Sequence, residues 1–255
     1  MLHRPRRSHA LFALALATLA AACGSDSSTA PNVQPVTLDQ ALAELSGPAL
    51  SATAASFDVG PALPALVASR CAYESSSQSF ACTPLVANGL TVTQGFTLLD
   101  AAGAKQAAFD KASTSAVRAN TTVAGTLQQG QLQLAVDGEQ ELTLTGLRTA
   151  THTLDGTSRV HVASISGSGL PFETTVNTTI TGLKLPAPTA DGTRPWPTAG
   201  TIVVETSNSI GGAPPAVIRA TITFSGTSKV AVTLTGPGVS ATCTIDLASQ
   251  APSCS

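Results

Sequence analysis

Two histidines are the residues of this chain whose type and spacing most invite a chemical interpretation. His152 and His161 lie on either side of Asp155-Gly156. If that dipeptide forms a two-residue hairpin, the two imidazoles lie diagonally on one side of paired strands, where they could seed a metal or acid–base site. A catalytic zinc usually has three protein ligands, and the sequence places no carboxylate with this pair. We therefore predict surface or rim histidines, no bound metal and no cofactor.

Four cysteines form two segments with the same internal spacing. Cys71 and Cys82 are separated by ten residues, and so are Cys243 and Cys254. Each segment resembles a hairpin with cysteines on facing strands, within reach of a disulfide. Three pairings of four cysteines exist, and the two local pairings close the shortest loops. Structural zinc ligands are usually two to four residues apart, so we predict the disulfides Cys71–Cys82 and Cys243–Cys254 instead of a metal site.

Other chemical signatures are weak. The chain lacks the short motifs of serine hydrolases, zinc proteases and phosphate-binding loops. Glu139 and Glu141 share one face of a predicted strand, and a solvated face is the favoured interpretation. Trp196 stands between Pro195 and Pro197. It is either a cap on the open end of the apolar core, which we favour, or a contact point for a partner.

Composition narrows the function classes. From Cys23 onward the chain has ten Lys and Arg against fifteen Asp and Glu, a net charge of 10 − 15 = −5. An acidic surface with one Trp and one Tyr argues against nucleic-acid binding. Thr occurs 34 times in this part. Because Thr is β-branched and polar without charge, it favours strands with a solvated face.

The elements that must position these residues are mostly strands. Thr37-Leu38-Asp39-Gln40 is a capping box, and an apolar face that follows it predicts one short helix ending at Gly47-Pro48. Strands are predicted over 70–74, 80–86, 90–99, 114–127, 131–147, 149–165, 172–185, 201–207, 216–225, 229–235 and 240–247. Short turns between them predict an antiparallel meander. We therefore predict an all-β fold, an open or curved barrel or a sandwich, with one short N-terminal helix.

One strand carries the clearest pattern. Leu132, Leu134, Val136, Leu142 and Leu144 share one parity and can all point to one face. The dipeptide at 137–138, Asp-Gly, could instead form a hairpin. We favour one long strand with a bulge, because the parity is unbroken.

The N-terminus has the features of an export signal. Three arginines precede an apolar run from Ala10 to Ala22 that is too short to span a bilayer as a helix, which takes roughly 20 residues. The junction Leu19-Ala20-Ala21-Ala22-Cys23-Gly24-Ser25 resembles the lipobox of bacterial lipoproteins, although that pattern prefers Leu where Ala20 stands. The resemblance implies a diacyl or triacyl modification of Cys23. Gly24 in place of the family's retention Asp implies the outer membrane, in a cell that has one.

These observations predict three segments. Residues 1–22 form a signal peptide, 23–36 a lipidated flexible tether, and 37–255 a single β-rich domain. We expect an exported, lipid-anchored envelope protein, a binding or scaffolding β domain and not an enzyme. Its expected partners are the membrane, through the lipid on Cys23, and an apolar small molecule or an envelope protein. The alternatives are an envelope hydrolase whose site is assembled from separate strands, and an adhesin-like surface module.

Overall fold

A computed structural model describes residues 71–87, 89–129, 132–166, 170–186, 195–247 and 251–254. The chain divides into two units, Met1–Phe57 and Asp58–Ser255, and every described residue belongs to the second. The predicted signal peptide, Cys23 with its tether, and the helix expected after Thr37 lie outside the described residues.

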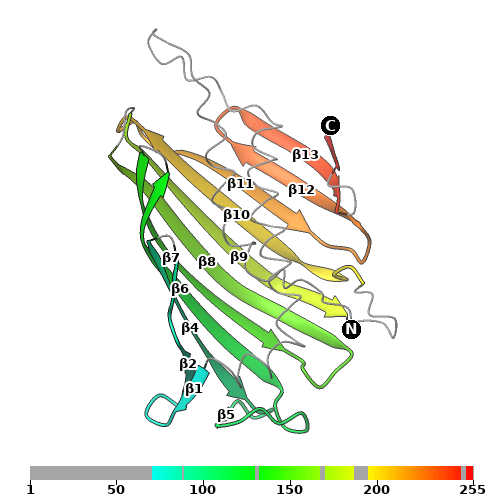
Figure 1. Cartoon of the computed structure of the whole chain (residues 1–255). Helices are drawn as coiled ribbons and strands as arrows, with labels where there is room; N and C mark the ends of the chain where they lie inside the picture. The colour runs from blue at the N-terminus through cyan, green and yellow to red at the C-terminus, as the bar shows by residue number, and fades with distance from the viewer. Residues whose placement is uncertain are drawn as a thin grey trace, which may run out of the picture. The chain divides into compact units, whose positions relative to one another are not determined.

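The described residues form one large antiparallel sheet of fourteen strands (Figure 1). The strands are β1 (Cys71–Glu74), β2 (Ser79–Cys82), β3 (Leu85–Ala87), β4 (Leu90–Leu99), β5 (Lys105–Gln106), β6 (Ala116–Gln129), β7 (Leu132–Thr145), β8 (Thr151–Ser166), β9 (Phe172–Pro186), β10 (Ala199–Ile210), β11 (Ala216–Thr223), β12 (Lys229–Gly236), β13 (Val239–Asp246) and β14 (Ala251–Cys254). Their order in the sheet is β1-β2-β4-β6-β7-β8-β9-β10-β11-β12-β13-β14, and β3 and β5 pair only with β4.

This order confirms the predicted meander, since strands that follow one another in the chain are neighbours in the sheet. The sheet is open, because β1 and β14 do not pair with each other. The predicted strand over 80–86 is two strands, β2 and β3, separated at Thr83-Pro84. Pro84 has no backbone N–H to donate to a ladder, which explains the break.

β7 is one long strand, as favoured from its parity. Its residues pair continuously with β6 from Leu132 to Thr145, so Asp137 and Gly138 do not turn the chain. The irregularity in the strand lies in its pairing with β8, between Gln133 and Leu134. Leu134, Val136 and Leu144 are buried on one face. The shared parity therefore predicted both the strand and its buried side.

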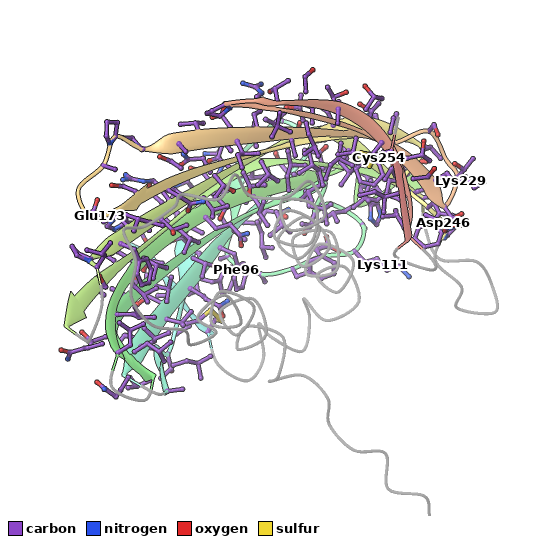
Figure 2. The ribbon with its side chains drawn as sticks, turned by 90° about the horizontal axis from the view of Figure 1, so that it is seen from above. Phe96, Lys111, Glu173, Lys229, Asp246 and Cys254 are labelled. Atoms are coloured by element: carbon purple, nitrogen blue, oxygen red, sulfur yellow. A yellow bond between two sulfur atoms is a disulfide. The ribbon has the colours of Figure 1, made fainter. Side chains whose placement is uncertain are left out.

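Directly paired residues point to the same face of a sheet, so the register defines rows of side chains that run across the strands. One such row, which we call the central apolar row, consists of Phe80, Phe96, Ala119, Leu142, Gly156, Ile180, Ile202, Ile222, Val232, Cys243 and Cys254. Figure 2 shows the sheet curled, with Phe96 on its concave side. We call the face that carries this row the concave face, and the opposite one the convex face.

The concave face contains the buried core of the sheet. Its most deeply buried side chains, each 0% exposed, are Leu98, Leu183, Ile202, Val204, Ala220 and Leu234. At the β1–β4 end, Phe80 stacks on Phe96 with ring centroids 4.6 Å apart, and Tyr73 contacts Phe80 at 5.3 Å. The core therefore runs from one end of the strand order to the other.

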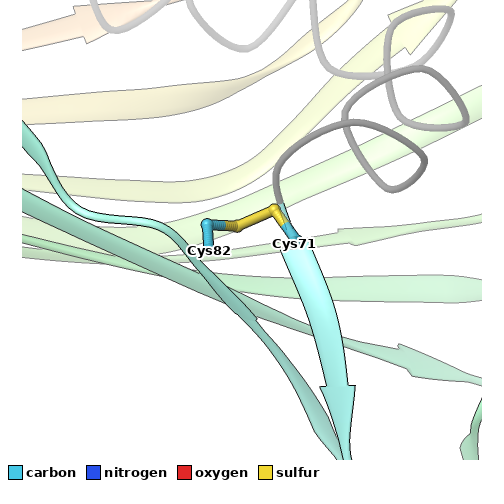
Figure 3. Close-up of a disulfide and its surroundings, with 2 residues drawn as sticks. All are labelled: Cys71 and Cys82. Atoms are coloured by element: carbon cyan, nitrogen blue, oxygen red, sulfur yellow. A yellow bond between two sulfur atoms is a disulfide. The ribbon is translucent and has the colours of Figure 1, made fainter.

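Both edges of the open sheet are fastened by a disulfide. The bonds Cys71–Cys82 (Figure 3) and Cys243–Cys254 are present, as predicted. Each joins directly facing residues of the last hairpin at its edge, β1–β2 on one side and β13–β14 on the other. Two short edge strands are thereby held in place by covalent bonds.

Removing either bond should lower the stability of the sheet. Closing a loop of this length contributes about 3 kcal/mol in the chain-entropy model, so we expect a loss of about 2–4 kcal/mol for each double Cys→Ala variant. The loss should be larger for Cys243 with Cys254, because Cys243 is 1% exposed whereas Cys71 is half-buried. Urea unfolding of each double variant, under oxidising and under non-oxidising conditions, measures the two losses of stability. Ser253→Ala, next to Cys254, is the control, and an unchanged midpoint in both double variants would contradict the expectation.

Candidate functional site

The two histidines do not form a site. β8 runs without a turn through Asp155 and Gly156, so the hairpin on which their proximity depended is wrong. His152 has the parity of buried Leu154, on the concave face, whereas His161 has the opposite parity. A sequence separation of nine residues along one strand corresponds to roughly 30 Å. The histidines lie on opposite faces, far beyond the reach of a shared metal or substrate.

His161 belongs to a charged region of the convex face. Its Nδ1 lies 2.9 Å from Oδ1 of Asp137, its directly facing neighbour on β7. The carboxylate of this pair is exposed, with 64% of the Asp137 side chain accessible. With a protonated imidazole, His161 and Asp137 form a surface ion pair.

Two other ion pairs lie elsewhere on the convex face. Arg219 Nη1 lies 2.9 Å from Glu205 Oε1, and Arg118 Nε lies 3.6 Å from Glu141 Oε1. Glu141 is exposed, and so is Glu139 on the same face, as the sequence indicated. Exposed pairs of this kind contribute about 0–1 kcal/mol each. They give the convex face a charged, water-exposed surface.

His152 lies among apolar neighbours on the concave face. It directly faces Leu185 on β9, which is buried. Burial lowers the pKa of His152 below its ordinary value of 6.5 because the charged imidazolium loses solvation. The folded chain therefore takes up this proton less readily than the unfolded chain does.

This lowered pKa predicts a specific pH dependence. When the folded pKa is lower than the unfolded one, the free energy of unfolding falls as the pH drops below the ordinary value of 6.5. We expect His152→Leu to weaken that acid destabilisation, measured by urea unfolding at about pH 7.5 and about pH 5.5. His161→Gln, on the convex face, is the comparison. An unaltered pH dependence in His152→Leu would show that another group titrates.

A polar turn between β5 and β6 explains one further perturbed group. The pKa of Asp110 lies below its ordinary value of 3.8, because the backbone N–H of Ala112 and the hydroxyl of Ser113 donate to its carboxylate. The Asp110 N–H donates in turn to Thr114 Oγ1, and Thr114 is 1% exposed. These bonds close a turn of the backbone, so the arrangement is structural.

Trp196 lies beside the ends of β9 and β10. Its side chain is 37% exposed, whereas Pro197 is among the fully buried residues. The carbonyl of Pro197 accepts from the N–H of Gly226, and the N–H of Thr198 donates to the carbonyl of Lys184. The backbone that follows Trp196 is thus held by Lys184 of β9 and by Gly226 of the loop between β11 and β12. The role of Trp196 as a partner contact stays a prediction.

The sheet separates charge from apolar surface completely along its long strands. The Asp, Glu, Lys and Arg residues of β6–β13 all have the parity of the convex face: Arg118, Asp137, Glu139, Glu141, Asp155, Arg159, Glu173, Lys184, Glu205, Arg219, Lys229 and Asp246. On β4 and β6–β13, His152 is the one titratable side chain that faces the concave side. The concave face is therefore an uncharged surface, and it is the candidate functional site.

Sequence reasoning found part of this face. It identified the five apolar residues of β7, from Leu132 to Leu144, but not the rows that join them to neighbouring strands. Those rows depend on register, which is fixed by pairings such as Leu142 with Gly156. The alternation within each strand was the available signal.

Within the described ranges no group of three or more His, Cys, Asp and Glu residues could hold a metal ion. Nor do these ranges contain a helix long and apolar enough to cross a membrane. In comparisons of sequence and fold, no protein-family model, no curated protein and no solved structure matches this chain.

Proposed function

We propose that this chain is an exported, lipid-anchored protein of the cell envelope whose β domain is a binding module for an apolar ligand. Cys23 would carry the lipid, and residues 23–36 would tether the domain. The function is one of holding and presenting a ligand and includes no chemical step.

One observation carries the proposal: the complete segregation of charge on the sheet. A concave, uncharged face about fifty ångströms long, as strands of up to 16 residues imply, suits an alkyl or ring compound more than a charged metabolite. The convex face, by contrast, has paired charges and exposed Thr residues, which suit contact with water. Leu132 and Leu142 lie at half-buried positions of the concave face, where a ligand could be contacted.

An uncharged fluorescent probe, N-phenylnaphthylamine, tests the proposal on the full chain. Saturable fluorescence enhancement, together with displacement by a long-chain lipid, is the expected result. Leu142→Asp places a charge on the concave face and should abolish the enhancement, whereas Thr143→Asp changes the adjacent residue of the convex face and should preserve it. Absence of saturable enhancement in the unaltered chain would end the ligand-binding proposal.

A further inference from the structure

A row of polar residues crosses the concave face beside the central apolar row. Gln94 on β4 faces Thr121 on β6, which faces Gln140 on β7, Ser158 on β8 and finally Thr178 on β9. We call these five residues the polar row. With strands about 4.8 Å apart, the row extends over roughly 20 Å. The same row continues on β10–β12 with Val204, Ala220 and Leu234, so its polar part is confined to one half of the sheet.

Four of the five residues in this row are exposed or half-buried, whereas Thr178 at its β9 end is buried, with 7% exposed. Among the described residues, Gln94, Thr121, Gln140 and Ser158 make no side-chain hydrogen bond. The described part of the chain contains no buried side-chain oxygen or nitrogen without a partner, so the unpaired groups of these four residues keep some exposed surface. Gln94 is exposed, and Thr121, Gln140 and Ser158 are half-buried. Amides and hydroxyls of this kind offer both donors and acceptors to a ligand.

Small residues lie close to the centre of the row. Gln140 lies between Gly138 and Leu142 on its own strand, and Ala119 and Gly156 face Leu142 from the two sides. Gly138 cannot be enlarged without movement, since a Cβ there would lie 2.9 Å from Cγ1 of Val123. Gln140 itself is half-buried, and its direct neighbours across the strands are the short side chains of Thr121 and Ser158.

Apolar residues border the row on both sides. The central apolar row lies along one side. Along the other lie Val92, Val123, Gly138, Val160 and Val176, which pair in succession from β4 to β9. A polar strip between two apolar strips matches a molecule that has a hydrogen-bonding group attached to alkyl chains.

The absence of Lys and Arg from the concave face of these strands indicates which class of ligand can bind there. No Lys or Arg of β4 or β6–β9 lies on the concave face, so an ionised carboxylate or phosphate placed there would lose its hydration without gaining a counter-charge. A hydroxyl, ester or amide group loses less and can be paired by the free groups of the row.

We propose that the polar row binds the uncharged polar group of a neutral amphiphile, such as the glycerol and ester of a monoacylglycerol, while its alkyl chain lies along the adjacent apolar row. This inference rests on the proposed function, because it names the ligand class of the same face.

The experiment compares three probes that share one chain length: monooleoylglycerol, oleate and octadecene. Each displaces N-phenylnaphthylamine from the purified full chain. We expect monooleoylglycerol to bind at least about tenfold more tightly than oleate, which is charged. In the double variant Thr121→Val with Gln140→Leu, two hydrogen bonds are lost, and monooleoylglycerol should bind about five- to a hundredfold more weakly. Octadecene, which has no polar group, should be unaffected.

Two further variants provide a convex-face control and a substitute for the double variant. Thr122→Val makes the same change one residue away, on the convex face, and should leave all three affinities unchanged. Gln94→Leu alters an exposed member of the row and should weaken the binding of monooleoylglycerol about two- to tenfold. This single variant replaces the double variant in the test if the double variant has a lower thermal midpoint than the unaltered chain.

The outcomes separate the two proposals. If N-phenylnaphthylamine and octadecene bind but monooleoylglycerol shows no preference over oleate, or responds equally to Thr122→Val, the polar row is overturned and the apolar-ligand function stands. If no probe binds the unaltered chain, both fail.

Discussion

Leu234→Ala should lower the free energy of unfolding by about 2–5 kcal/mol, the range for removing a buried leucine. Leu234 is 0% exposed on the concave face. It faces Ala220 on β11 and Ala241 on β13, and neither alanine can fill the space that a shortened side chain would leave. The cavity therefore persists, which puts the expected loss toward the upper part of the range. Urea unfolding with both disulfides oxidised measures it through the midpoint at constant slope.

Thr233→Ala is the matched control, because it changes the adjacent residue of the same strand. Thr233 is exposed on the convex face, between Thr221 and Thr242. Its replacement should change stability by less than about 1 kcal/mol. Similar losses for Leu234→Ala and Thr233→Ala would mean that the concave face does not carry the core.

Cys23→Ala should move the protein from the membrane fraction to the soluble fraction almost completely. Each buried methylene of an acyl chain contributes about 0.8 kcal/mol, and stable anchoring takes more than one chain. Removal of the residue that we propose carries all the lipid therefore removes the anchor in a single step. The measurement is fractionation of cells that express the full chain with its signal, followed by intact mass of the membrane-extracted protein.

Ser25→Ala, two residues further on, controls for changes at the junction that leave the cysteine in place. It should remain in the membrane fraction, with a mass increased by the acyl groups. A Cys23→Ala protein that still requires detergent for extraction would contradict the lipid anchor. An unmodified mass for the unaltered protein would contradict it independently.

The fold class could be predicted from local patterns because alternation and turn residues are local properties. β4 begins and ends where the sequence placed it, at Leu90 and Leu99, and the Thr-rich composition corresponds to a convex face that is polar with few charges. Both disulfides followed from equal spacing, since a hairpin places its cysteines opposite each other. Cysteine spacing is informative here because it concerns residues close in the chain.

The candidate site was less accessible to sequence reasoning because it depends on distant residues. Asp155-Gly156 has the composition of a turn, yet β7 and β9 pair with β8 on both sides and extend it. Tertiary pairing thus overrode turn propensity, and the proximity of the histidines disappeared with the turn. Gln94 and Gln140 are 46 residues apart, so no short window could place them in one row.

The disulfides at β1–β2 and β13–β14 have a consequence for how this sheet avoids other copies of itself. An open sheet has two edges whose unpaired backbone groups can template a further strand. Here the outermost strand at each end of the strand order, β1 or β14, has four residues and is tied back by one disulfide, and β14 also contains Pro252, which cannot donate. We expect loss of both bonds to release β1 and β14 and to leave β2 and β13 as edges at which another copy can pair. Light scattering by the two double Cys→Ala variants would report that pairing, and monodisperse variants would exclude it.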